Sequence, residues 1–313
     1  MRLDILAALS GVLISLQTRA NGELSHLIDN GLEAALVSFG SGLIIILLIT
    51  PFNSHIKEGI TNLREAVKQR KIAKWKLLAG ALGGSFVAIQ TQVVPLIGVA
   101  IYSVASIAGQ TAMSLIVDRI GLTGGGKKLI SPRRISAAFI TVLAVLVSVL
   151  DRINSNNLSK FAVIGGCISG ALVGFRSALN GEINEHTHQS FTTSLINFIS
   201  GTSFLLLLMV GGIFLGKVHL TRLPGGPWWI YTGGVIGVIY IAFISTIVQH
   251  LGVLTFTLFS VGGQLLSSLI IDVISPTKGV HVSTYLVTGI VMTYLGVIVG
   301  GVSNSQGRRR LTP

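Results

Sequence analysis

The sequence is poor in charge. Only 11% of its 313 residues are Asp, Glu, Lys or Arg, whereas soluble domains average about 25%. So few charged side chains cannot cover the water-facing surface of a globular protein of this length, which excludes an ordinary soluble domain. Cysteine is almost missing as well, because Cys167 is the single one. One cysteine permits neither an intrachain disulfide nor a thiolate metal cluster, and its apolar surroundings predict a small packed side chain.

Motifs of enzymatic chemistry are also missing. Residues 121–128 resemble a Walker A loop, but Lys128 stands where a Ser or Thr would hold Mg²⁺, and the zinc-protease pattern H-E-x-x-H does not occur. The nucleophile pattern G-x-S-x-G does not occur either. His186 and His188 lie near Glu182, which leaves a metal site or a solvated loop open. We expect no enzyme, no cofactor and no bound metal.

Long apolar runs and glycine take the place of charge. Half of the residues are hydrophobic and 38 are Gly, which is more frequent in membrane helices than in soluble ones. Runs of about 18 to 25 apolar residues can span a bilayer as helices, whereas a transmembrane barrel would need short alternating segments. The first run resembles a signal peptide, but polar Gln17 and Arg19 follow it without a cleavage site, so we expect a retained helix. The expected fold is an all-α polytopic membrane protein with ten transmembrane helices. These expected spans are residues 3–22, 32–51, 76–94, 97–117, 133–150, 161–180, 191–214, 228–248, 252–271 and 282–302.

Lys and Arg collect on one side of the expected spans. Sixteen of the 23 lie before the first span or after the second, fourth and tenth, against five in the loops of the other side. This asymmetry predicts that both termini are cytoplasmic, with residues 303–313 as a basic cytoplasmic tail. The net charge of +12 then needs no nucleic-acid partner. Between Asn53 and Lys74, apolar residues at helical spacing predict an amphipathic surface helix, either bound to lipid or solvated.

The chain is a doubled sequence. GQTAMSLIVD at residues 109–118 and GQLLSSLIID at residues 263–272 share six of ten residues at an offset of 154. Earlier in each half the offset is 159, as in the N-G-E stretches at residues 21–23 and 180–182. Residues 1–150 and 151–302 are therefore predicted to be two copies of one five-helix unit. Because five is odd, the second copy enters the membrane from the opposite side, as in many secondary transporters.

Small residues recur every fourth position in the first helix of each unit. Such stripes predict close helix packing in lipid, with a hinge as the alternative. They are Ala7, Gly11 and Ser15 in the first unit and Gly166, Gly170 and Gly174 in the second.

Ten helices in two inverted repeats resemble the drug/metabolite transporter superfamily. The N-G-E and G-Q-x3-S-L-I-x-D motifs, each present in both halves, resemble its YdcZ-type branch over nearly the whole chain. The resemblance implies a DMT/EamA-like fold and a bacterial inner-membrane transporter or exporter, without implying a substrate. In related small multidrug exporters a Glu within the first helix binds cationic substrate and protons. Here the expected spans place Glu23 and Glu182 at helix ends, which argues against proton-coupled export of cations.

Polar side chains within spans are functional candidates because they are costly in lipid. Gln110 and Gln264 lie eight residues before Asp118 and Asp272, about 12 Å deeper at 1.5 Å per residue, near the bilayer midplane. Arg176 can bind a carboxylate or phosphate, or else pair with a local carboxylate or snorkel to the interface. The predicted substrate-binding residues are Gln17, Asn21, Gln110, Ser114, Arg176, Asn180, Gln264 and Ser268.

A second group of polar residues lies nearer the ends of the spans. Arg19 and Glu23 are spaced for an i,i+4 pair, and the two Asn of the N-G-E stretches can cap helix ends instead of lining a pathway. The residues around the third-to-fourth helix turns are gates or interfacial side chains. The predicted gating or coupling residues are Arg19, Glu23, Gln92, Asp118, Glu182, Gln249, His250 and Asp272.

Together these features predict a secondary transporter or exporter that does not hydrolyse ATP. It moves a small metabolite or drug-like molecule by alternating access, with its site at the interface of the two repeats. The alternative is a non-transporting scaffold or lipid-handling membrane protein, in which buried Gln and Asn only tie helices together at about 0.6–2 kcal/mol each. The expected partners are a small-molecule substrate and the lipid bilayer, and a homodimer is compatible with the sequence.

Overall fold

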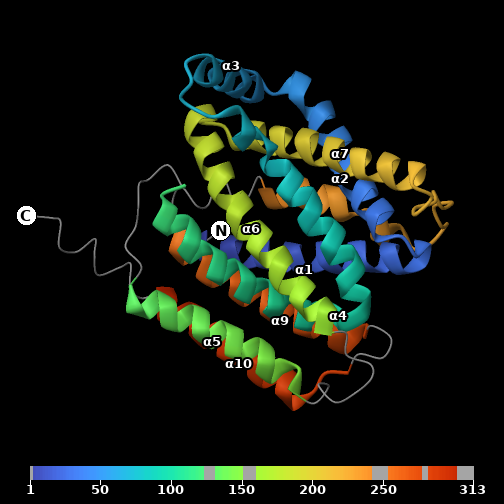
Figure 1. The fold of residues 1–313 in the computed structure, drawn as a ribbon, viewed down its shortest axis with the longest axis vertical. Helices are drawn as coiled ribbons and strands as arrows, with labels where there is room; N and C mark the ends of the chain where they lie inside the picture. Colours follow the sequence, from blue (N-terminus) through green and yellow to red (C-terminus); the bar gives the residue numbers. More distant parts are fainter. Residues whose placement is uncertain (1–2, 123–130, 151–159, 242–252, 277–280, 302–313) are drawn as a thin grey trace, which may run out of the picture.

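The computed structural model of the chain is a bundle of helices (Figure 1). It describes residues 3–122, 131–150, 160–241, 253–276 and 281–301, and no strand occurs in these ranges. Short 3₁₀ segments join several of the α-helices. The α-helices are α1 (Leu3–Ile28), α2 (Gly31–Ile49), α3 (Ser54–Lys68), α4 (Ala79–Ile120), α5 (Pro132–Ser148), α6 (Lys160–Thr187), α7 (Ser190–Phe214), α9 (Val253–Ile274) and α10 (Thr284–Gly301), and the 3₁₀ segments are η1 (Thr50–Phe52), η2 (Lys74–Leu78) and η4 (Trp228–Tyr231). A further helix follows η4 and is described over residues 233–241.

Helix α4 consists of two membrane-length helices joined at Gly98. Its 42 residues would extend about 63 Å if straight, roughly twice the thickness of a bilayer core. The backbone of Gly98 has φ 82° and ψ 169°, a conformation that glycine adopts without a steric penalty. Figure 1 shows the chain changing direction within α4. The expected spans at residues 76–94 and 97–117 thus follow each other almost without a loop, with the break at Gly98.

Helix pairs recur with the two halves exchanged. Figure 1 shows α4 beside α6 and α1 beside α9. By the sequence offsets, α6 corresponds to α1 and α9 to the second part of α4. In the first pair, a Cβ atom added at Gly109 would collide with the carbonyl oxygen of Cys167; in the second, one added at Gly263 would collide with that of Ala8. Gly109 matches Gly263 at the offset of 154, and Ala8 matches Cys167 at the offset of 159. The same close contact therefore occurs once in each helix pair.

The small-residue stripes make a second contact of this kind. A Cβ atom added at Gly170 of α6 would collide with the carbonyl oxygen of Ser106 in α4, and one at Gly11 of α1 would collide with that of Ser260 in α9. These contacts are those expected of two copies related by an approximate two-fold axis. Close packing, the main interpretation of the stripes, is thus confirmed at Gly11 and Gly170.

The amphipathic helix α3 packs on protein. Its apolar side, which includes Ile56 and Leu63, is buried against the ends of α6 and α7. The Thr192 hydroxyl donates to the carbonyl oxygen of Ile56 at 3.2 Å, and the Asn62 amide donates to that of Thr187 at 3.4 Å. The helix was correctly expected, but neither lipid nor water covers its apolar face, because the second half of the chain does.

The outer surface of the bundle is apolar. Large side chains such as Leu48 on α2, Phe161 on α6 and Leu207 on α7 are 66%, 87% and 71% exposed. Within the described ranges, four segments are long and apolar enough to cross a membrane, at residues 31–52, 74–117, 160–187 and 190–214. Shorter apolar helices occur at residues 135–148, 259–274 and 284–299. This surface suits lipid rather than water.

Candidate functional site

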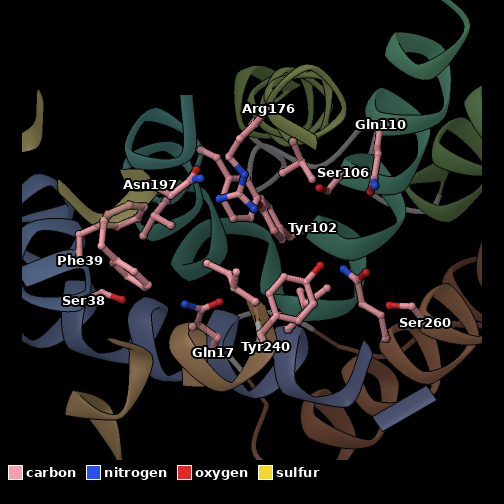
Figure 2. Close-up of a pocket in the computed structure, with 18 of the residues that line it drawn as sticks. Gln17, Ser38, Phe39, Tyr102, Ser106, Gln110, Arg176, Asn197, Tyr240 and Ser260 are labelled. Carbon is pink, nitrogen blue, oxygen red and sulfur yellow. The ribbon is translucent and has the colours of Figure 1, made fainter. Parts of the chain in front are cut away.

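A cavity lies between the two halves of the chain (Figure 2). Its empty space is about 950 Å³ when the opening to solvent is included, which sets an upper limit on the size of a bound molecule. Helices α1, α2 and α4 of the first half and α6, α7, the helix at residues 233–241 and α9 of the second half form its walls. The lining residues are Ile14, Gln17, Ser38, Phe39, Phe86, Val87, Tyr102, Ser106, Gln110, Val173, Arg176, Asn197, Phe198, Gly237, Tyr240, Ile241, Ser260, Val261 and Gln264.

The cavity lies where the repeats meet. Phe39 and Phe198, which are equivalent at the offset of 159, contact each other with ring centroids 5.4 Å apart and ring planes tilted by 57°. When two equivalent residues of the two repeats contact each other, both lie close to the two-fold axis that relates the repeats. Each ring also occupies the space that a side chain at Gly201 or Gly42 would need, again in equivalent pairs. The cavity therefore surrounds the approximate axis that relates the halves.

Four of the predicted substrate-binding residues line this cavity: Gln17, Gln110, Arg176 and Gln264. Gln110 and Gln264 are equivalent, so the placement of the glutamine pair near one central point agrees with the depth reasoning. Gln17 and Arg176 are equivalent as well, and each lies against an equivalent glycine, Gly237 and Gly83. Their roles in binding remain predictions.

Gln17 and Arg176 differ in how they are satisfied. The Gln17 side-chain amide donates to the Gly233 carbonyl oxygen at 2.9 Å. The buried Nε of Arg176 has no hydrogen-bond partner, and no ion pair to Arg176 forms within the described part of the chain. Its Cζ lies 6.0 Å from the centroid of the Phe86 ring, and Figure 2 shows its side chain directed into the cavity. The local partner considered for it is engaged elsewhere, because Glu182 pairs with Lys76.

The two predicted asparagines lie beside the cavity wall rather than in it. Asn180 accepts a 2.7 Å hydrogen bond from the lining residue Asn197. Asn21 donates to Gln90 at 3.4 Å, and Gln90 in turn donates to Thr18 at 2.9 Å. This chain of buried polar groups links α1 to α4. The asparagines are thus positioned to hold the helices that form the cavity.

The two predicted serines point back to their own helices. The Ser114 hydroxyl donates to the Thr111 carbonyl oxygen at 2.7 Å, and the Ser268 hydroxyl donates to that of Leu265 at 2.9 Å. The cavity is lined instead by Ser106 and its equivalent Ser260, which lie four residues before Gln110 and Gln264. We predicted the serine four residues after each glutamine, whereas the serine four residues before it lines the cavity.

Sequence reasoning also missed the residues that α2 and α7 contribute. Ser38 and Asn197 line the cavity at equivalent positions, as do Phe39 and Phe198. Polar and aromatic residues that recur at the offset of 159 were the available signal. Tyr102 and Tyr240 carried the same aromatic signal at the offset of 154, because their counterparts are Phe256 and Phe86.

Two of the predicted gating residues form the expected helical pair. Arg19 and Glu23 are 3.1 Å apart, and Arg19 also donates to the Ser275 hydroxyl at 3.0 Å. The Arg19 Cζ lies 6.0 Å from the centroid of the Trp229 ring. The i,i+4 pairing of Arg19 with Glu23 is confirmed. The contacts of Arg19 with Ser275 and Trp229 connect α1 to the second half.

Glu182 and Asp272 both connect the two halves. The Lys76 Nζ lies 2.6 Å from the Glu182 carboxylate, which joins η2 to α6. The buried Asp272 carboxylate accepts the backbone N–H groups of Val99 at 3.2 Å and Ala100 at 2.8 Å. It therefore caps the second part of α4 just after the turn at Gly98. Asp272 has a structural partner in the other repeat, and a gating role for it stays a prediction.

The remaining gating candidates are less informative. Gln92 is exposed on α4, next to the buried Gln90. Gln249 and His250 lie outside the described residues, as does the side chain of Asp118. Within the described ranges no three His, Cys, Asp or Glu side chains gather as metal ligands, so the open alternative of a metal site at His186 and His188 gains no support.

Comparison with known proteins assigns the chain to a family. Residues 3–147 and 161–299 match the family described as "Putative inner membrane exporter, YdcZ". The chain belongs to the YdcZ family. The resemblance drawn from the repeated N-G-E and G-Q-x3-S-L-I-x-D motifs is therefore confirmed. As a YdcZ protein, the chain is a multi-pass helical protein of the inner membrane, and the exporter in the family's description is consistent with a protein that is not an enzyme.

A solved structure shares the fold of this YdcZ protein. Titled "Crystal structure of protein", it has 12% sequence identity and a TM-score of 0.58, and the match covers 99% of this chain and 98% of that one. At this identity the similarity shows the fold alone. No curated protein matches the chain.

Proposed function

We propose that this YdcZ protein is a secondary transporter that exports a small metabolite or drug-like molecule by alternating access. The cavity between the halves is its substrate site. The observation that carries the proposal is the position of that cavity at the interface of the repeats, with walls formed by equivalent residues such as Gln110 and Gln264. Transporters built from inverted repeats bind their substrates at such an interface, near the bilayer midplane.

The reciprocal contacts support an inverted arrangement. When each repeat crosses the membrane five times, an axis that relates the repeats lies in the membrane plane, so they insert in opposite senses. The ten spans then leave both termini in the cytoplasm, as the distribution of Lys and Arg indicates. Two similar units of opposite orientation can adopt each other's conformation, so inward-open and outward-open states have similar energies. Alternating access follows from that near equality.

Uptake into proteoliposomes tests this function. The purified protein is reconstituted and challenged with a panel of radiolabelled carboxylates, amines, sugars and nucleosides. We expect at least one class to accumulate, and we expect Gln110→Ala and Gln264→Ala to slow that uptake while the melting temperature stays near the wild-type value. Gln69→Ala, at an exposed position next to α3, is the matched control.

Two outcomes would contradict the proposal. If no solute of the panel moves, and the cavity variants change only the melting temperature, the glutamines are structural. The protein would then be a scaffold or lipid-handling protein. If Gln69→Ala slows uptake as much as the cavity variants do, the cavity has no special part in transport.

A further inference from the structure

We infer that the cavity binds a small organic monoanion, in which one carboxylate is attached to an aromatic or other apolar body, and that Arg176 holds the carboxylate. This inference rests on the proposed function, because it takes the cavity as the substrate site. It names the chemical class of the substrate, which neither the family nor the fold specifies.

The first support is the charge of the cavity. Arg176 is the one permanently charged side chain among the lining residues, and none of them is Asp or Glu. Three described carboxylates near the interface of the halves are occupied: Glu182 by Lys76, Glu23 by Arg19, and Asp272 by backbone N–H groups. Within the described residues, the guanidinium therefore has no protein counter-ion. A buried charge without a partner is costly, and an anionic ligand removes that cost.

The second support is the difference between the two repeats. At the position equivalent to Arg176, Gln17 is neutral and its amide is satisfied by the Gly233 carbonyl oxygen. Arg176 replaces this satisfied amide with a cation whose buried Nε has no acceptor. It also breaks the symmetry of the cavity, so an anionic group binds on the α6 side in one orientation.

The third support is the chemistry of the remaining walls. Phe86 lies next to the guanidinium, and Phe39, Phe198, Tyr102 and Tyr240 add further ring surface. Figure 2 shows amide and hydroxyl groups between these rings, on both sides of the open space. Binding sites for small molecules combine such apolar surface with a few polar groups that set orientation. The body of the ligand is therefore apolar or aromatic, with its charge at one end.

The number of charges limits the class further. One guanidinium neutralises one negative charge and can bind a carboxylate through two parallel hydrogen bonds. A phosphate monoester carries about −1.5 to −2 near neutral pH, so part of its charge would stay buried and unpaired. An amino acid brings an ammonium group, and the described lining residues include no carboxylate to bind it. Monocarboxylates are thus favoured over phosphates and zwitterions.

Titration of the full-length protein in detergent with five probes of one ring size tests the inference. The probes are benzoate, benzamide, phenyl phosphate, phenylalanine and benzylamine. The affinity of each is measured by calorimetry at neutral pH. We expect benzoate to bind at least tenfold more tightly than each of the others. Arg176→Gln, which installs the residue of the first repeat, is expected to weaken benzoate binding by about 10- to 100-fold, as loss of a charge-assisted contact predicts. Arg176→Lys is expected to be intermediate.

Arg222→Gln is the matched control, because this exposed arginine lies in the loop after α7, away from the cavity. The affinity of the Arg222→Gln variant for benzoate should equal that of the wild type. Equal binding of benzoate and benzamide by the wild-type protein would overturn the inference even if Arg176→Gln failed to fold. Stronger binding of phenylalanine or phenyl phosphate would overturn the stated class.

Transport separates this inference from the proposed function. Labelled benzenesulfonate, a permanent monoanion that does not cross lipid as a neutral acid, is used in proteoliposomes. Binding of benzoate without movement of benzenesulfonate or any other solute would overturn the transporter and leave the anion site. Uptake of benzylamine without benzoate binding would overturn the anion site and leave the transporter.

Discussion

The contact between Gly170 and the Ser106 carbonyl oxygen makes a sharp prediction about stability. A Cβ atom at position 170 would collide with that oxygen, which is a backbone atom and cannot rotate away. Helices α4 and α6 must therefore separate in Gly170→Ala, and such overpacking typically costs about 1–3 kcal/mol. Alanine regains up to about 1 kcal/mol through its higher helix propensity. We expect a net loss of about 1–2 kcal/mol, measured as a lower melting temperature in detergent.

The same helix contains its own control. Gly181 is exposed, and a Cβ atom there would have no neighbour within 4 Å. Gly181→Ala makes the same chemical change with no collision, so it should leave the melting temperature unchanged or raise it slightly. If Gly170→Ala melts at the same temperature as Gly181→Ala, the close approach of α4 and α6 is not as described, and the reciprocal packing of the repeats loses its support.

Two further predictions concern contacts between the halves. Asp272→Ala removes two hydrogen bonds from the start of the second part of α4 and should cost about 3 kcal/mol, whereas Asp272→Asn, which keeps one acceptor, should lose less; equal melting of both variants and the wild type would contradict the cap. Lys76→Glu and Glu182→Lys should each lower the melting temperature, and the double exchange should recover part of it by restoring the pair. No recovery in the double variant would show that the two side chains do not interact.

Much of the fold could be predicted because the two halves of the chain can be aligned with each other. The offsets of 154 and 159 identify equivalent residues without any structure, and these residues form the recurring contacts at Gly11 and Gly170. Depth could be predicted too, because helical rise converts residue number into distance. That reasoning placed Gln110 and Gln264 at one cavity.

Other features could not be predicted for physical reasons. An amphipathic pattern has the same period whether lipid, water or protein covers its apolar face, so the docking of α3 on α6 and α7 was not readable. Polar residues that recur along one helix do not reveal which of them will face a cavity between helices. Ser114 was therefore predicted to bind substrate, whereas Ser106 lines the cavity. Asp272 was predicted as a gating or coupling residue, and its carboxylate accepts hydrogen bonds from backbone groups 172 and 173 residues away, too far along the chain for a local pattern to reveal.

Composition, charge asymmetry and internal repetition are properties of the linear chain, so they alone predict a helical membrane protein made of two similar halves. The choice of which polar residues share a cavity depends instead on contacts between residues far apart in the chain, and only packing decides it. Arg176 illustrates the difference. Its burial in a span is apparent from sequence, but the local alternatives for its charge are dismissed only when Glu182 is seen to pair with Lys76 and the guanidinium is seen to face an open cavity.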